Sequence, residues 1–309
     1  MIAAFLLLAI AFPPRTSGYA AVYDGTRVVA ESHSAEVNAE TLFDIGSIVK
    51  TFTAVAVLRL ADAHKLSLDA SISKYIAGVP ADKAPITIRD LLTHRSGLVR
   101  YVSDGDFIKI SRDDVVKVAM TTPLSHPPGT VEEYADTNYH LLAVIIELIT
   151  HKPFAEYIEA TILKPLHLDH TMFYGDPRIA RLHVAKGFVD GVEKGDAATF
   201  PLTWSMIGAG GMLSDAKDMS RWIDWIARQH RAEFEQPPMK RWSAGFEIRT
   251  KPPMVLKGGA NDYGYLAAIG YVPGTERRAV VLINRMSSKA PGAHHTMLHD
   301  LLAPEPRVQ

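Results

Sequence analysis

Strand-like segments stand at both ends of this chain, with a long region of helical and loop character between them. The first two, residues 19–23 and 27–31, are joined by Asp24-Gly25, a pair typical of tight hairpin turns. Three more lie near the C-terminus, at residues 245–249, 265–271 and 279–284. We therefore predict an α+β fold in which both termini contribute strands to one antiparallel sheet that is flanked by helices.

The middle of the chain is expected to form a mostly helical lobe inserted into the sheet-containing part. The pattern of apolar residues predicts helices at residues 47–64, 88–92, 112–120, 138–149, 154–162, 216–228 and 293–302. We expect residues 15–65 and 205–303 to form an α/β lobe, and residues 66–204 to form the helical lobe. Residues 304–309 form a polar, proline-containing tail that we expect to fray.

The composition excludes several classes of function. The chain has 309 residues and a formal net charge of −1, so it lacks the basic excess with which proteins hold nucleic-acid phosphates. It contains no cysteine, which rules out thiol nucleophiles, disulfides and thiolate metal sites. No segment is apolar and long enough to predict a stable membrane span. The oligomeric state stays open.

The first residues raise the question of export. We assign residues 1–14 as a candidate signal segment, because the apolar run before Pro13-Pro14 has the length of a secretory signal core. Ala9-Ile10-Ala11 resembles a cleavage site, although no lysine or arginine precedes the run. If residues 1–11 act as a signal, the protein is periplasmic or secreted. A trimmed gene start or a packed first helix are the alternatives, and the protein would then be cytoplasmic.

Ser47 and Lys50 are the first candidate catalytic residues. They lie three residues apart at the start of a predicted helix, and therefore on one face of it. The helix that follows is apolar nearly all round, so it should be buried. Burial lowers the pKa of a lysine, and a neutral lysine could take the proton of a nearby serine hydroxyl. Taken alone, however, a Ser-x-x-Lys pattern is also compatible with an ordinary helix N-terminus that has a serine cap.

Four further stretches turn this weak pattern into a strong one. They are residues 86–98, which contain Thr93-His94-Arg95-Ser96-Gly97, residues 128–139, which contain Tyr134-Ala135-Asp136, the loop 208–211 and the segment 257–260, which we expect to lie just before a strand. Together with the Ser47 segment, and in this order, they resemble the serine β-lactamase and penicillin-binding protein superfamily. The similarity is to its class C-like branch, which includes D,D-peptidases, D-aminopeptidases and β-lactamase-fold esterases. The resemblance covers roughly residues 18 to 303.

The resemblance implies a role for each matching residue. Ser47 would be the acylated nucleophile and Lys50 its activator. Tyr134 would act as general base or proton relay, and two nearby lysine cations would favour its ionised form. Lys257 would supply the second of those charges. The backbone N–H groups of Ser47 and Ala260 would form the oxyanion hole.

One position near Tyr134 departs from the family pattern, and a second could compensate for it. Position 136 is aspartate where the family more often has asparagine, so an acceptor replaces a donor. The negative charge of Asp136 would favour protonated Lys50 and oppose a Tyr134 phenolate. Asp136 could pair with Lys50 and tune it, or it could bind a cationic group of the substrate such as a free ammonium. Asn138 could supply the missing amide if a helix begins there.

The second departure concerns recognition of a substrate carboxylate. Gly258, followed by Gly259, replaces the hydroxyl residue that normally helps to hold the carboxylate of β-lactams and D-Ala-D-Ala ends. We therefore expect a small-molecule or peptide substrate that is an ester or a D-amino-acid amide, with weak β-lactam hydrolysis and no cofactor. The alternative is a non-catalytic relative that uses the cleft as a sensor or binding site.

Histidines give no metal site in this interpretation. His294, His295 and His299 fall on the last predicted helix, but no carboxylate completes a zinc-binding pattern. We expect them to form a polar helix face. His94 is interpreted as structural, through hydrogen bonds to the local backbone.

Overall fold

The computed structural model describes residues 10–235 and 241–303. Most of the candidate signal segment, residues 1–9, lies outside this range, as does the tail 304–309. In the part that is described, no helix has both the length and the apolar character needed to cross a lipid bilayer.

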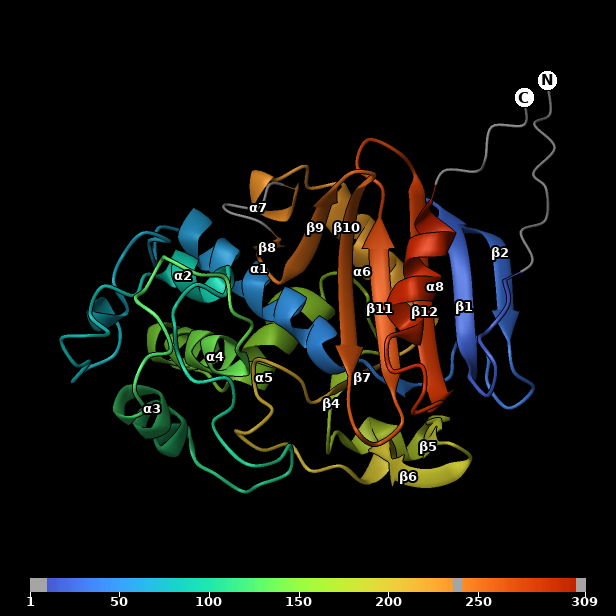
Figure 1. The fold of residues 1–309 in the computed structure, drawn as a ribbon, viewed down its shortest axis with the longest axis horizontal. Helices are drawn as coiled ribbons and strands as arrows, with labels where there is room; N and C mark the ends of the chain where they lie inside the picture. Colours follow the sequence, from blue (N-terminus) through green and yellow to red (C-terminus); the bar gives the residue numbers. More distant parts are fainter. Residues whose placement is uncertain (1–9, 236–240, 304–309) are drawn as a thin grey trace.

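The main sheet is assembled from both ends of the chain, which confirms the predicted α+β architecture (Figure 1). Its path runs β2-β1-β12-β11-β10-β9-β8, and all neighbours on this path are antiparallel. The bounds are β1 (Ser17–Asp24), β2 (Arg27–His33), β8 (Trp242–Ser243), β9 (Phe246–Thr250), β10 (Pro253–Ala260), β11 (Leu266–Tyr271) and β12 (Arg277–Met286). One prediction was wrong here, because residues 257–260 lie inside strand β10 rather than just before a strand.

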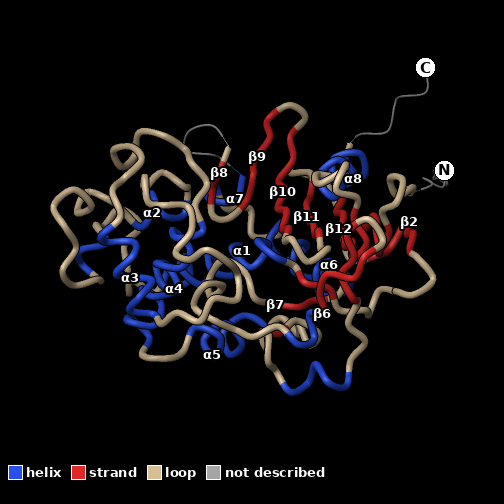
Figure 2. Tube along the Cα trace, turned by 60° about the horizontal axis from the view of Figure 1, so that its bottom comes forward, coloured by secondary structure: helices blue, strands red, loops and turns tan. Residues whose placement is uncertain are grey.

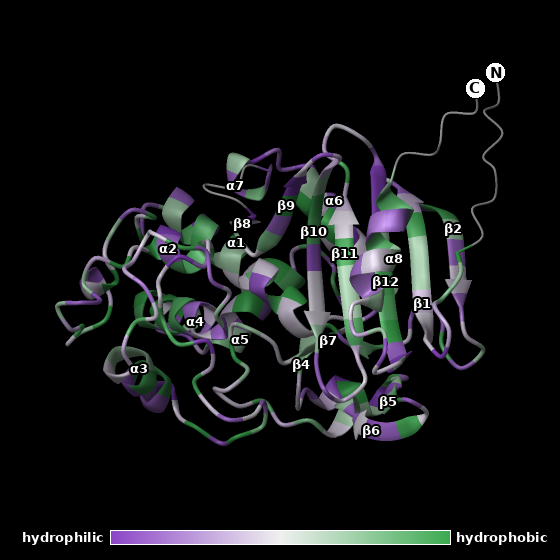
Figure 3. Ribbon diagram, viewed as in Figure 1, coloured by the Kyte–Doolittle hydropathy of each residue, from purple (hydrophilic) through white to green (hydrophobic). Residues whose placement is uncertain are grey.

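Helices cover both faces of this sheet. Strand β10 alternates between the faces, with Val255 in the cluster that includes α1 (Val49–Asp62) and α6 (Ala216–Ala227), and Leu256 in the cluster with α8 (Ala293–Leu302). The strands with two covered faces are apolar on both sides, as the hydropathy colours of β11 and β12 show (Figure 3). Strand β2 at the edge carries polar residues as well.

The remaining helices gather beside the sheet around α1, as the tube view shows (Figure 2). They are α2 (Ile88–Leu92), α3 (Arg112–Thr121), α4 (Asp136–Thr150) and α5 (Phe154–Ile158), which continues as a π-helical turn at Glu159–Leu163; the short α7 (Ala232–Glu235) lies near β8 and β9. Capping boxes begin α2 at Thr87 and α3 at Ser111. Helix α4 is buried along most of its length and contacts α1, α2, α3 and α5.

The region of helices and loops also contains strands that the sequence analysis missed. A second sheet has the order β3-β7-β4, formed by β3 (Phe43–Asp44), β7 (Met212–Ser214) and β4 (Met172–Phe173). The hairpin of β5 (Lys186–Val189) and β6 (Val192–Asp196) joins the main sheet through β12. Strands of two to five residues are too short for an alternating pattern to distinguish them from loops.

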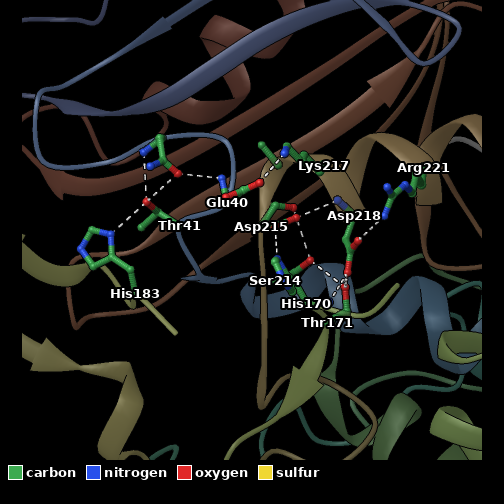
Figure 4. Close-up of polar contacts among 12 residues, drawn as sticks. Glu40, Thr41, His170, Thr171, His183, Ser214, Asp215, Lys217, Asp218 and Arg221 are labelled. Carbon is green, nitrogen blue, oxygen red and sulfur yellow. Dashed lines mark hydrogen bonds and ion pairs between the residues drawn. The ribbon is translucent and has the colours of Figure 1, made fainter. Parts of the chain in front are cut away.

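A polar network holds the N-terminus of α6 against the second sheet (Figure 4). Asp215 caps the helix by accepting from the Asp218 N–H group at 2.8 Å, and His170 Nδ1 lies 2.6 Å from the Asp215 carboxylate. Asp218 in turn accepts from the Thr171 hydroxyl at 2.9 Å. These bonds fix the chain before β4 and after β7, and with it the position of the loop 208–211 that precedes β7.

Candidate active site

Ser47 stands on a 3₁₀ turn, Gly46–Ile48, immediately before helix α1. Its hydroxyl oxygen receives two hydrogen bonds, from Lys50 Nζ and from the Tyr134 hydroxyl, each 2.9 Å long. The turn needs glycine at position 46, where φ is +47° and a Cβ would lie 2.9 Å from the Ala260 nitrogen. The Asp44 carboxylate accepts a hydrogen bond of 2.6 Å from the Gly46 N–H group and so stabilises the turn.

Lys50 is fully buried, on the first turn of α1. Its ammonium forms an ion pair of 2.7 Å with Asp136 and donates to the Ala209 carbonyl at 3.0 Å. Burial lowers the pKa of Lys50 below its ordinary value even though the charge of Asp136 opposes that shift. A lowered pKa is what the sequence led us to expect for a lysine at this position. The loop 208–211 contributes the Ala209 carbonyl, which accepts a hydrogen bond from the Lys50 ammonium.

Tyr134 lies between the two lysines, but their charges do not decide its protonation state. Lys50 Nζ and Lys257 Nζ lie 5.1 Å and 5.2 Å from the centre of its ring. Burial, and then the charge of Asp136, nevertheless raise the pKa of the Tyr134 phenol well above its ordinary value. Of the two influences expected on Tyr134, the opposition of Asp136 therefore prevails over the lysine cations, and the phenol is a proton donor at neutral pH.

Lys257 projects from strand β10 on the side of Tyr134 and is buried. Burial, and then the charge of Lys50, lower its pKa well below the ordinary value. Its ammonium lies 5.1 Å from the ring centre of Trp242, a residue that the sequence analysis did not identify.

The two nitrogens expected to form the oxyanion hole are brought together where the Ser47 turn meets β10. A Cβ at Gly259 would lie 2.7 Å from the Ser47 nitrogen and 2.2 Å from the Ile45 carbonyl oxygen. Ser47 and Ala260 both line the same cavity. Glycine at position 259 is therefore what allows the strand to approach the nucleophile.

Asn138 does not face this cavity, so it does not supply the missing amide. Its side chain is fully buried, its oxygen accepts from the Ser96 hydroxyl at 2.5 Å, and its nitrogen lies 3.1 Å from His94 Nδ1. His94 also accepts from the Ala135 N–H group at 3.3 Å and stacks beside Tyr134, with the ring centres 4.4 Å apart. Asn138 and His94 thus hold the Tyr134 loop in place through contacts with Ala135 and the Tyr134 ring.

Gly258 faces helix α8, and its neighbours explain why the position carries no side chain. A Cβ there would lie 2.4 Å from His295 Nε2 and 3.1 Å from His294 Nε2. His294 is buried, with a ring centre 4.3 Å from that of His295. The expectation of a polar, solvated histidine face was therefore wrong for His294, because α8 packs this side against the sheet.

Replacing Gly258 with threonine is expected to lower the free energy of unfolding by about 1–3 kcal/mol, because the new side chain overlaps His295. The double variant with His295→Ala should recover most of that loss, because the imidazole is gone. Chemical denaturation of the four proteins in this cycle measures the coupling. Equal losses in the single and double variants would contradict the packing explanation.

A cavity of about 770 Å³ opens in front of Ser47. Asp136 lines it, as does a loop that the sequence analysis did not identify, residues 99–106. Gly258, Gly259 and Asn138 do not line it. The loop carries no motif that distinguishes it in the sequence from an ordinary surface loop, which is why it was missed.

Comparison with known proteins gives consistent matches. A family model described as "Beta-lactamase" matches residues 13–303. A Salmonella paratyphi A protein described as "Putative D-alanyl-D-alanine carboxypeptidase" is 30% identical over 236 residues, which cover 66% of this chain and 54% of that protein. The chain thus spans about half the length of this curated relative.

Solved structures show the same fold. An octameric penicillin-binding protein homologue from Pyrococcus abyssi is 23% identical, with a TM-score of 0.77 over 92% of this chain and 73% of that one. A D-stereospecific amidohydrolase from Streptomyces sp. is 21% identical, with a TM-score of 0.76 over 94% of each chain. At these identities the likeness extends to the fold alone.

Proposed function

The chain belongs to the β-lactamase family, and from this we propose that it is a serine hydrolase that forms an acyl-enzyme on Ser47. One observation carries the proposal. The Ser47 hydroxyl is held at 2.9 Å by both a buried lysine and a tyrosine, on the floor of a cavity. This is the arrangement of a nucleophile, a base and a second proton carrier.

The proposed reaction has two steps. Ser47 Oγ attacks the substrate carbonyl carbon while neutral Lys50 takes the hydroxyl proton, and the backbone N–H groups of Ser47 and Ala260 bind the oxyanion. The bond to the leaving group then breaks, and the leaving group receives a proton from the neutral Tyr134 phenol, which Lys50 reprotonates. Water adds to the acyl-enzyme in the reverse manner and releases the acid and free Ser47.

We propose an ester or a D-amino-acid amide or peptide as substrate, with weak activity on β-lactams. The names of two similar proteins, a carboxypeptidase for D-alanyl-D-alanine and a D-stereospecific amidohydrolase, support acyl groups of D-amino acids. Position 258 faces helix α8 and does not line the cavity, so Gly258 supplies no group that could clamp a substrate carboxylate.

A substrate panel tests this proposal. It contains p-nitrophenyl esters, D- and L-amino-acid p-nitroanilides, a peptide ending in D-Ala-D-Ala and nitrocefin, all assayed with wild-type protein. We expect turnover of esters or D-anilides, at a kcat/KM well above that for nitrocefin. Efficient cleavage of nitrocefin, with no turnover of the esters, the D-anilides or the D-Ala-D-Ala peptide, would contradict the proposed substrate class.

Asp136→Asn is expected to shift the acid limb of the pH profile of kcat/KM to lower pH. The acid limb reports loss of activity as Lys50 becomes protonated, and the charge of Asp136 raises the pKa of Lys50. Removing that charge lowers the pKa, so neutral Lys50 persists to lower pH. Stopped assays across the pH range with wild type and with the surface control Asp113→Asn provide the comparison. A shift to higher pH, or none, would show that Lys50 is not the base.

A further inference from the structure

The cavity in front of Ser47 holds more negative charge than the proposed reaction uses. Five carboxylates line it, those of Asp44, Asp104, Asp106, Asp136 and Asp262. Arg100 is the one cationic side chain among the lining residues of the described structure, and it is exposed. Its guanidinium lies 5.1 Å from the ring centre of Tyr101.

Two of these carboxylates are already occupied within the protein. Asp136 forms its ion pair with Lys50 at 2.7 Å. Asp44 is buried and accepts from the Asn261 side chain and from the Gly46 N–H group at 2.6 Å each, as well as from the Tyr174 hydroxyl. The charge of Asp136 is therefore paired, and the oxygens of Asp44 are engaged by donors within the protein.

Asp106 differs from the other carboxylates. Its backbone carbonyl accepts from the hydroxyls of Thr203, at 3.3 Å, and Ser205, so the loop is held in place. Its carboxylate is half-buried and has no ion-pair partner among the described residues. Burial, and then the charges of Asp136 and Asp262, raise the pKa of Asp106. A cation in the cavity would relieve this repulsion.

We propose that the cavity selects substrates carrying a positively charged amino group, and that Asp106 is the residue that determines this specificity. The inference rests on the proposed serine hydrolase activity, because Ser47 on the cavity floor is what places a substrate there. The chemical class is an acyl compound with a free ammonium group, such as an ester or amide of an amino acid. Asp262, which is exposed and also lines the cavity, adds to the same field.

Three p-nitrophenyl esters of nearly equal length test the proposal: the cationic 6-aminohexanoate, the neutral heptanoate and the anionic hydrogen heptanedioate. Wild-type kcat/KM should be highest for the cationic ester. Asp106→Asn should lower the ratio of cationic to neutral kcat/KM by about tenfold, the scale of one unpaired charge in a partly buried site. The kcat/KM for the neutral ester should change much less than that for the cationic ester, so the ratio of the two isolates the loss of charge recognition.

Asp300→Asn is the matched control, because Asp300 is exposed on α8 and does not line the cavity. The wild-type ratio should also fall as sodium chloride is raised, since salt screens the field of the carboxylates. This second measurement needs no variant.

The two levels of the proposal fail differently. If the wild type hydrolyses all three esters with no preference for the cation, or if Asp106→Asn leaves the ratio unchanged, the specificity proposal is overturned and the hydrolase stands. If no ester and no anilide is hydrolysed, the proposed function itself is overturned.

Discussion

Ser47→Ala is expected to lower the hydrolysis of any substrate by at least about 10⁴-fold, the scale at which removal of a nucleophile disables a serine hydrolase. The Ser47 hydroxyl oxygen accepts hydrogen bonds of 2.9 Å from both Lys50 Nζ and the Tyr134 hydroxyl, so its removal takes away the atom that both groups serve. Intact-mass analysis after treatment with a fluorophosphonate should give a single adduct on the wild type and none on the variant.

Ser73→Ala serves as control, because Ser73 is exposed on a short 3₁₀ turn and does not line the cavity. It should keep full labelling and activity. An adduct that persists in Ser47→Ala would place the nucleophile elsewhere. A wild type that forms no adduct with any acylating probe would instead favour the non-catalytic sensor or binding protein that the sequence left open.

Gly259→Ala is expected to reduce activity by about 100-fold or more and to lower the free energy of unfolding by about 2–3 kcal/mol. The added Cβ would stand 2.2 Å from the Ile45 carbonyl oxygen and 2.7 Å from the Ser47 nitrogen, and both are backbone atoms. Strand β10 or the Ser47 turn must move to make room. Either movement separates the two N–H groups that would bind the oxyanion.

Gly292→Ala is the matched control, since a Cβ there meets no atom within 4 Å. Thermal unfolding and kcat/KM should be measured together for both variants. An active Gly259→Ala protein with unchanged stability would contradict the close approach of β10 to the nucleophile. Activity lost with stability retained would instead locate the damage in the oxyanion hole.

Much of the fold followed from local patterns. The hairpin at Asp24-Gly25 and the apolar runs near the C-terminus have strong signals, and the structure places them in one sheet through the pairing of β1 with β12. Strand β10 was not predicted, because Gly258 and Gly259 have low strand propensity. They lie in a strand because they pair with Ala268 and Ala267 of β11. Glycine is needed at both positions because a Cβ at Gly258 would overlap His295 and one at Gly259 would overlap the Ser47 turn.

The sequence predicted which residues form the candidate site, but not the protonation state of each. Ser47, Lys50, Tyr134 and Lys257 are brought together by α1, β10 and the loop before α4. The protonation state of Tyr134 could not be predicted, because it depends on how deeply the phenol is buried and on its distance from Asp136. Asn138 could not be excluded from the cavity until the helix phase of α4 was known.

By itself, the sequence determined which groups are present: a serine and a lysine one helical turn apart, a tyrosine and a second lysine in family order, and an aspartate at position 136 in place of an amide. The regular repeat of an α-helix places residues three apart on one face, so this pairing can be derived from the sequence alone. The tertiary structure decided which charges face one another across elements far apart in the chain. Burial sets the pKa of each lysine and of Tyr134, and only the folded loop 99–106 places Asp106 in the cavity in front of Ser47.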